Sequence, residues 1–316
     1  MIRYAQRTAE RMVSPLEKKY IKGRQPSQIF TLEKDGFLGE FYPGFRRNGR
    51  AVLYVGGASC DRRMTLAMGS YLVDAGFSVL FLGFYLWEGL PKEMWRIPVD
   101  YAERAAQWLT EQGYEVCMMG ASTGAGYTLL SASLVPEIHD VVAMAPFDHV
   151  FEGMEMLGRA PHCSVYQFHG EEYPYSCFDI VKDGWPAAFR TARKAGVSLK
   201  GFMRFGYESA RLNPDSRIQV ENIHGDILLT TAEYDVMWPA DQAVARMKRV
   251  LEESAWPHRL TTIVYPCRSH GLGVGVVGPK WISDLTMRAM GMPKDLTEKA
   301  RADIIRWLDK KENMMS

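Results

Sequence analysis

The chain has 316 residues, and its 38 lysines and arginines nearly balance 37 aspartates and glutamates, which leaves a formal net charge of +1. This balance argues against a dedicated nucleic-acid-binding protein, which needs a basic face to displace phosphate counterions. Because 47% of the residues are hydrophobic and 24% are charged, the composition excludes wholesale disorder and is typical of a globular protein with one or two domains.

Short apolar segments alternate with longer amphipathic segments along most of the chain. The apolar segments predict strands at 51–55, 78–84, 115–119, 140–144, 226–231 and 260–265. The amphipathic segments predict helices at 62–75, 99–112, 127–134, 240–253 and 296–311. Strands that are apolar throughout, each followed by a helix, are typical of a doubly wound, mostly parallel sheet of the α/β class.

Two stretches depart from this alternation. Residues 1–35 are polar and weakly patterned, with a helical pattern around 4–20, so we expect an N-terminal extension. Residues 147–222 are rich in aromatic residues and methionine and show no clear strand. The simplest organisation is one catalytic domain over 36–316 that is interrupted at 147–222 by an inserted, mostly helical cap.

A glycine-flanked serine lies between a predicted strand and a predicted helix. Residues 120–124 read Gly-Ala-Ser-Thr-Gly, the G-x-S-x-G pattern, with Ser122 at its centre. Small residues allow a sharp turn that projects a serine hydroxyl from the carboxyl end of the sheet, and the next helix offers unpaired N–H groups. This context predicts a nucleophile, and the alternative is a turn that only packs the helix on the sheet.

A serine nucleophile needs a base and an acid, which follow it in the order Ser, Asp or Glu, His in this type of fold. His270 comes just after the last predicted strand, in a glycine-containing loop, and is our candidate for the base. Asp235 comes just after the preceding strand and is our candidate for the acid that orients the imidazole. Glu233 and Asp148 are the alternatives for the acid.

Backbone N–H groups are expected to form an oxyanion hole near the serine. One donor is the N–H of Thr123, directly after the nucleophile, and the second should come from the loop after the first central strand. That loop holds Gly57 and Ala58, so we assign the second donor to Ala58 or Gly57. The alternative is that this loop is an ordinary connection between a strand and a helix.

Together these residues resemble the α/β-hydrolase superfamily. More narrowly, the sequence resembles the C-terminal catalytic domain of acyl-CoA thioesterases and bile acid-CoA:amino acid N-acyltransferase, which is itself similar to dienelactone hydrolases. The segments that carry the resemblance are ILLTTAEYDVMWP (227–239), TIVYPCRSHG (262–271) and YPYSCFD (173–179). The resemblance implies the same nucleophile, acid and base: Ser122, Asp235 and His270.

The resemblance also implies two further expectations. These relatives carry an N-terminal β-sandwich domain, and since only about 35 residues precede the catalytic pattern here, we expect that domain to be missing. The family uses Ser or Cys as its nucleophile, and Ser122 implies hydrolysis rather than amide transfer, because water readily cleaves an oxygen ester.

The remaining features limit the cofactors, compartment and partners that we expect. The cysteines are odd in number and widely spaced without a C-x-x-C pair, which favours a reduced compartment; they are Cys60, Cys117, Cys163, Cys177 and Cys267. The N-terminus has no apolar signal-peptide core, and the longest apolar stretch, 78–87, is too short to span a bilayer. We therefore expect a cytoplasmic protein with no membrane span, nucleic-acid partner, metal or cofactor.

The expected function is that of a serine hydrolase acting on a small-molecule acyl ester or thioester. The aromatic and methionine side chains of the cap could line an acyl pocket, although packing of the cap on the core explains them equally well. Arg62 and Arg63 could meet an anionic substrate or simply begin a solvated helix. The alternative functions are an acyltransferase that uses an amine or alcohol acceptor, and a non-catalytic small-molecule-binding protein of the same fold.

Overall fold

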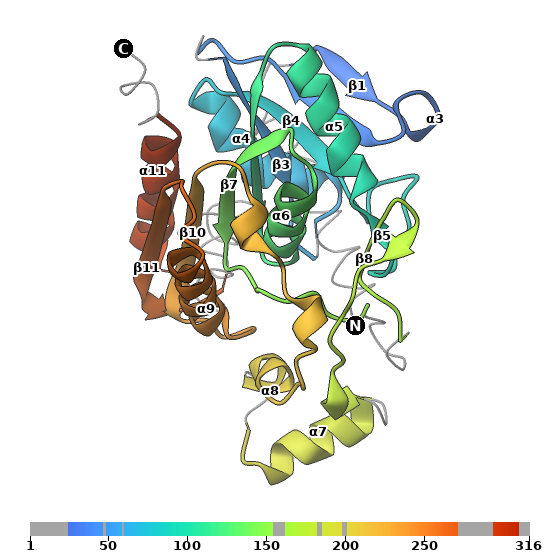
Figure 1. The fold of residues 1–316 in the computed structure, drawn as a ribbon, viewed down its shortest axis with the longest axis vertical. Helices are drawn as coiled ribbons and strands as arrows, with labels where there is room; N and C mark the ends of the chain where they lie inside the picture. Colours follow the sequence, from blue (N-terminus) through green and yellow to red (C-terminus); the bar gives the residue numbers. More distant parts are fainter. Residues whose placement is uncertain are drawn as a thin grey trace.

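The computed structural model of the protein describes residues 25–46, 49–58, 60–153, 162–181, 185–197, 201–270 and 293–309. Within these residues an eight-stranded sheet forms the centre, with the strand order β1-β2-β4-β3-β6-β7-β10-β11 (Figure 1). Its strands are β1 (Gln28–Phe30), β2 (Leu38–Tyr42), β3 (Arg50–Val55), β4 (Ser78–Gly83), β6 (Glu115–Ala121), β7 (Ile138–Met144), β10 (Ile227–Tyr234) and β11 (Leu260–Arg268). From β4 to β11 all neighbouring strands are parallel. At one edge β2 pairs antiparallel with β4, and β1 pairs antiparallel with β2. The expected mostly parallel α/β sheet is confirmed.

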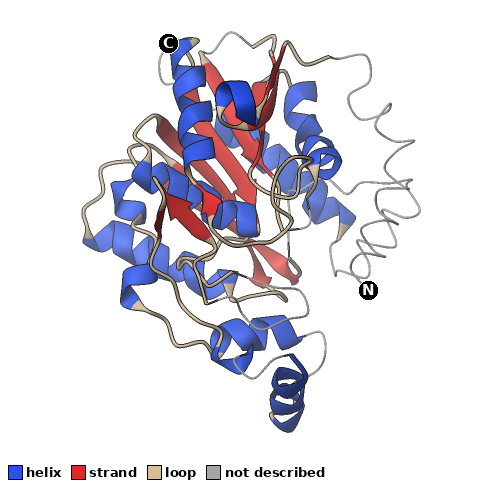
Figure 2. Ribbon diagram, turned by 90° about the vertical axis from the view of Figure 1, so that its right-hand side faces the viewer, coloured by secondary structure: helices blue, strands red, loops and turns tan. Residues whose placement is uncertain are grey.

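Helices cover both faces of this sheet (Figure 2). One face packs against α5 (Asp100–Glu111), α6 (Thr123–Leu134) and α9 (Ala240–Glu253), whose buried side chains belong to one core cluster. The other face packs against α4 (Arg62–Asp74) and α11 (Lys294–Asp309), which belong to a second cluster. The chain is thus doubly wound around the sheet.

The central strand β3 explains why its residues are apolar without alternation. Leu53 and Val55 point into the first core cluster, whereas Val52 and Tyr54 point into the second. All of these side chains are fully buried, because a helix layer covers each face. A strand that is buried on both sides appears in the sequence as a continuous apolar run.

The segment between β7 and β10 is richer in strands than the sequence suggested. It holds β8 (Tyr166–Phe168) and β9 (Glu171–Glu172), which join β5 (Ile97–Pro98) in a separate three-stranded sheet. The expectation of no clear strand within 147–222 is therefore wrong. A two-residue turn explains the hairpin, because His169 and Gly170 both have positive φ angles, 49° and 83°, as type I′ turns require.

The helices of the same segment lie away from the main sheet. They are α7 (Trp185–Lys194) and α8 (Phe202–Glu208), with the short 3₁₀ turns η1 (Asp179–Val181), η3 (Pro214–Ser216) and η4 (Val220–Asn222). Figure 1 places α7 and α8 below the sheet, beyond the end of β7. This arrangement is the basis for proposing that the segment is a cap.

The main sheet begins earlier in the chain than expected. β1 and the short helix α3 (Leu32–Asp35) both lie inside the range 1–35 that the sequence pattern set apart as an extension. Because β1 pairs with β2 over three residues, part of that range belongs to the sheet. The helical pattern expected around 4–20 lies outside the described residues.

Two glycines bring α6 unusually close to the strands. A Cβ at Gly120 would lie 2.3 Å from the carbonyl oxygen of Gly124, and a Cβ at Gly124 would lie 2.0 Å from the carbonyl oxygen of Gly56. Real Cβ atoms do not approach backbone atoms so closely, so the helix could not sit here with larger residues. The first turn of α6 is therefore fixed against both β6 and the end of β3.

We expect Gly124→Ala to lower the free energy of unfolding by about 2–3 kcal/mol, because the added methyl group overpacks a rigid backbone contact. Urea denaturation measures this change. Gly126→Ala is the matched control in the same helix, since its Cβ would meet only the Tyr166 hydroxyl at an ordinary 3.6 Å. That substitution should be neutral or stabilise the helix by up to about 1 kcal/mol. Equal losses in the two variants would contradict the close-contact explanation.

Candidate active site

Ser122 occupies a strained turn at the carboxyl end of the sheet. It lies between β6 and α6 with φ 59° and ψ −126°, and residues other than glycine rarely adopt a positive φ angle. Its backbone N–H donates to the carbonyl oxygen of Met144 at the end of the neighbouring strand β7, at 2.8 Å. This geometry is the one expected for a serine whose hydroxyl must project from the turn.

His270 and Asp235 lie beside Ser122. The distance from His270 Nε2 to Ser122 Oγ is 2.8 Å, and the distances from His270 Nδ1 to the two carboxylate oxygens of Asp235 are 2.8 and 2.9 Å. Asp235 is fully buried and His270 is 9% exposed. Since β10 ends at Tyr234 and β11 ends at Arg268, all three side chains come from the carboxyl ends of parallel strands. The structure therefore brings together the three residues selected from the sequence.

Glu233 and Asp148, the alternative candidates for the acid, do not contact His270 in the structure and have other surroundings. Glu233 is exposed to solvent. Asp148 is buried, but its carboxylate accepts two hydrogen bonds of 2.6 Å from Arg246 and lies 3.1 Å from His149 Nδ1. Burial alone would raise the pKa of Asp148, yet the contacts with Arg246 and His149 lower it below the ordinary value. Asp148 is thus an ion-pair partner of α9.

The loop that carries Asp235 is held from two sides. Its carboxylate accepts the N–H of Met237 at 2.8 Å and, more weakly, that of Trp238 at 3.4 Å. Its backbone carbonyl accepts a 2.7 Å hydrogen bond from Arg204 Nη1, on α8. No local sequence pattern pointed to this contact of Arg204, because it joins two positions that lie far apart along the chain.

Trp238 fixes the imidazole from a second direction. Its ring meets that of His270 edge to face, with centroids 4.7 Å apart and planes at 79°. Its indole N–H donates to the carbonyl oxygen of Ala145 at 3.1 Å, so the ring is itself anchored to the end of β7. The tryptophan appeared in the sequence only as part of the family-like segment 227–239.

The proposed oxyanion donors differ in availability. The N–H of Gly57 donates to Cys60 Sγ at 3.2 Å, so this group is already engaged. Burial raises the pKa of the Cys60 thiol to about 12, which keeps the sulfur neutral near pH 7. The carbonyl of Thr123 accepts the Tyr166 hydroxyl at 2.8 Å, which helps to hold the residue that follows the serine. We therefore retain Ala58 and Thr123 as the proposed donors.

A pocket of about 490 Å³, counting the space open to solvent, opens beside Ser122. Its walls are mostly aromatic and aliphatic. They comprise Met94, Ser122, Thr123, Gly126, Phe147, His149, Val150, Phe151, Glu152, Val165, Tyr166, Phe178, Tyr207, Ile218 and Trp238. Most of these residues come from the segment between β7 and β10, which therefore supplies the aromatic wall that the sequence suggested.

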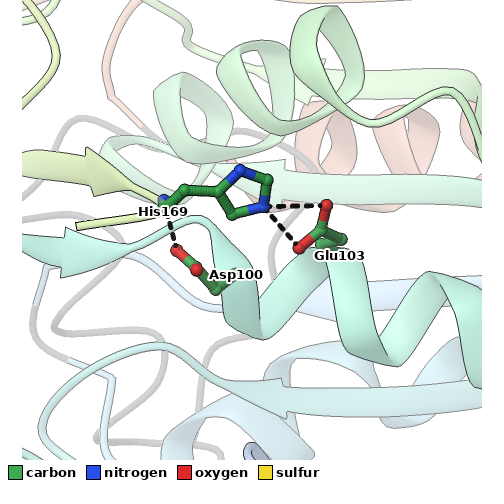
Figure 3. A group of neighbouring side chains, drawn as sticks. All are labelled: Asp100, Glu103 and His169. Carbon is green, nitrogen blue, oxygen red and sulfur yellow. Dashed lines mark hydrogen bonds and ion pairs between the residues drawn. The ribbon is translucent and has the colours of Figure 1, made fainter. Parts of the chain in front are cut away.

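A separate group of metal-ligating side chains lies at the β8–β9 hairpin (Figure 3). Asp100, Glu103 and His169 are the one such trio close enough to share an ion in the part of the chain that the structure describes. Hydrogen bonds already account for the arrangement: His169 Nε2 lies 3.0 and 3.1 Å from the Glu103 oxygens, and its backbone N–H donates to Asp100 at 3.2 Å. The trio therefore pins the hairpin to the start of α5.

Other candidates from the sequence also have structural partners. Arg62 forms an ion pair with the buried carboxylate of Glu40, which argues for a structural role at the start of α4. Within the described ranges, no helix is long and apolar enough to cross a membrane.

Comparison with known proteins adds to this geometry. The family described as BAAT / Acyl-CoA thioester hydrolase C terminal matches residues 97–275, more than half of the chain. The chain belongs to this family. The matched range includes Ser122, Asp235 and His270, so all three residues lie within the family's own region.

Individual relatives agree with this family. A mouse (Mus musculus) protein named peroxisomal succinyl-coenzyme A thioesterase is 34% identical over 97 residues, which cover 29% of this chain and only 22% of the mouse protein. The esterase LipW from Mycobacterium marinum superposes with a TM-score of 0.50 at 16% identity, covering 92% of this chain and 86% of LipW. MGS-M1, an α/β hydrolase from a deep-sea metagenome, superposes with a TM-score of 0.50 at 15% identity, and the match covers 92% of this chain and 98% of MGS-M1. The structural likenesses support the α/β-hydrolase fold alone.

The pair of His169 and Glu103 generates a pH-dependent prediction for this family member. The Glu103 hydrogen bond raises the pKa of His169 above its ordinary value of about 6.5. The contact therefore favours the protonated ring: its stabilising effect is present below pH 6.5 and disappears as the pH rises through the raised pKa. We expect an NMR titration to give a pKa above 6.5 for His169 and Glu103→Gln to lower it. An unchanged pKa in that variant would contradict this assignment.

Proposed function

We propose that this member of the family is a serine hydrolase that cleaves an ester or thioester through an acyl-enzyme on Ser122. The observation that carries the proposal is the continuous hydrogen-bonded chain from Ser122 Oγ through His270 to the buried Asp235, next to the aromatic pocket. This arrangement can activate a hydroxyl group, which is otherwise a poor nucleophile at neutral pH.

In the first half of the proposed reaction, Ser122 Oγ attacks the substrate carbonyl carbon while its proton moves to His270 Nε2. The Asp235 carboxylate accepts the Nδ1–H hydrogen bond, which keeps the ring oriented and stabilises the imidazolium without taking the proton. The N–H groups of Thr123 and Ala58 stabilise the developing oxyanion. His270 then protonates the leaving alkoxide or thiolate, and the acyl-enzyme remains.

In the second half, a water molecule takes the place of the leaving group. His270 removes a proton from the water as it attacks the acyl carbon, and then returns that proton to Ser122 Oγ as the acid is released. We propose hydrolysis rather than acyl transfer because the nucleophile is a serine oxygen. Product analysis with glycine, taurine or an alcohol as added acceptor separates the two outcomes, since only a transferase forms the amide or new ester.

The mouse relative's name suggests a CoA thioester as one substrate to examine. The shared region is a minor part of the mouse protein, so the proposal is limited to the bond that is cleaved. The domain organisation proposed with it is a catalytic α/β domain whose pocket is covered by the segment at 147–222.

We expect Ser122→Ala to abolish both covalent labelling by a fluorophosphonate and hydrolysis of p-nitrophenyl butyrate. The physical reason is that the alanine methyl group cannot attack phosphorus or carbon. Intact-protein mass spectrometry measures the label. Ser133→Ala is the matched control, because Ser133 lies in α6 and its hydroxyl only donates a hydrogen bond to the Leu130 carbonyl. Labelling of Ser122→Ala at the wild-type rate would exclude Ser122 as the nucleophile.

We also expect Arg204→Met to reduce kcat for the same ester about tenfold, because the Asp235 loop loses the hydrogen bond at its carbonyl and the acid is less well oriented. KM should change less, since Arg204 does not line the pocket. Arg268→Met is the matched control, because both arginines stack on the ring of Tyr234. The guanidinium carbon lies 4.1 Å from the ring centroid for Arg204 and 3.9 Å for Arg268. Equal losses of kcat in both variants would assign the effect to Tyr234 packing.

A further inference from the structure

The pocket beside Ser122 contains a buried carboxylate that the proposed mechanism does not use. Glu152 lies eight residues after the end of β7, in a bridge with Ser164, and its side chain is among those that line the pocket. Only 2% of its surface is exposed. A carboxylate in an otherwise apolar wall is costly to bury, so it calls for a functional explanation.

The two carboxylate oxygens of Glu152 are engaged to different extents. Oε1 accepts the backbone N–H of Phe178 at 2.5 Å. Oε2 is buried and forms no hydrogen bond within the described residues. The His162 ring is its one close contact among the described residues: Nδ1 lies 3.5 Å from Oε2, and the His162 side chain is 67% exposed. Oε2 is therefore held less firmly than Oε1, by an exposed imidazole alone.

The charges around Glu152 do not compensate it well. Burial raises the pKa of the Glu152 carboxyl above its ordinary value, and the exposed Asp179 adds to this effect, while the Phe178 N–H and the His162 ring oppose it without cancelling it. A cation bound at Oε2 would reverse that effect, because an opposite charge within a few ångströms favours the ionised carboxylate. A positively charged group is therefore the ligand that best offsets the cost of burying this carboxylate.

The aromatic walls favour the same kind of ligand. Phe151 and Phe178 stack with ring centroids 4.6 Å apart, and Tyr207 meets both edge on at 4.9 and 4.8 Å. Aromatic faces attract cations through their quadrupoles, and they also hold the methylene groups that connect a cation to the rest of a molecule. A carboxylate beside several aromatic rings is suited to an alkylammonium group.

We propose that Glu152 selects substrates whose acyl group ends in a protonated amine, with the ammonium group on Oε2 and the methylene chain against the aromatic walls. This proposal rests on the proposed function for its reaction, but it concerns specificity alone. Glu152 would act as a binding residue and would take no part in the proton transfers of Ser122 and His270.

The test compares two p-nitrophenyl esters of equal length, the 6-aminohexanoate and the heptanoate, which differ by an ammonium group in place of a methyl group. We expect wild-type kcat/KM to be about tenfold higher for the amino ester, and Glu152→Gln to remove this preference by raising its KM. The glutamine keeps a carbonyl oxygen for the Phe178 N–H, and the readout is the ratio of kcat/KM for the two esters within each variant, not the rate with either ester alone. The pimelate monoester, which ends in a carboxylate, should be the poorest substrate.

Asp179→Asn is the matched control, because it removes a nearby exposed carboxylate that does not line the pocket. It should leave the ratio between the two esters within about twofold of wild type. The proposal is wrong if the wild-type ratio is near one, if Glu152→Gln leaves the ratio unchanged, or if Asp179→Asn lowers it as much as Glu152→Gln does.

A binding measurement separates this proposal from the proposed function. Calorimetric titration of Ser122→Ala with n-hexylammonium and n-hexanol requires no turnover. Tighter binding of the ammonium ion, lost in the Ser122→Ala/Glu152→Gln double variant, supports the role of Glu152 even if no ester is cleaved. Equal affinities for the two ligands overturn it, even if the heptanoate is hydrolysed well.

Discussion

The close seating of α6 on the sheet is the constraint on which the rest of the site depends. Gly120 and Gly124 allow backbone to touch backbone where β6 turns into the helix, and the contact reaches Gly56, which directly follows the neighbouring strand β3. This contact fixes the start of α6 and holds Ser122 at its positive φ angle. A strained serine persists only where the surrounding structure determines it, and here three glycines do so.

The parallel sheet places Asp235 and His270 beside Ser122, because parallel strands end at the same edge of the sheet. Asp235 and His270 follow β10 and β11, which are neighbours in the sheet and end at the same edge as β6. Each functional group therefore needs only a short loop to reach the others. Between Ser122 and Asp235 the chain forms the strands β7 and β10 of the sheet and, between them, the segment that supplies most of the aromatic wall. This segment builds the pocket without displacing Ser122, Asp235 or His270.

These relations explain which features could be predicted from the sequence. The central strands are apolar on both faces, and the order of Ser122, Asp235 and His270 along the chain follows from the order of the strand ends. The β8–β9 hairpin was missed because its strands are two or three residues long and its turn is formed by His169, an unusual residue at positive φ. Arg204 and Glu152 were missed for another reason: their roles come from contacts with Asp235 and with the pocket, which no local pattern encodes.

Arg204 connects α8 to the loop that carries Asp235. On α8, Nη1 of this residue donates to both the carbonyl oxygen of Asp235 and the carboxylate of Asp241 at 2.7 Å, and its Nε donates to the carboxylate of Glu208 at 2.7 Å. The same guanidinium group covers Tyr234, the residue just before the acid. Tyr207, on the same helix, lines the pocket beside Ser122. One short helix therefore joins the wall of the pocket to the loop of Asp235, so the shape of the pocket and the position of that carboxylate depend on the same element.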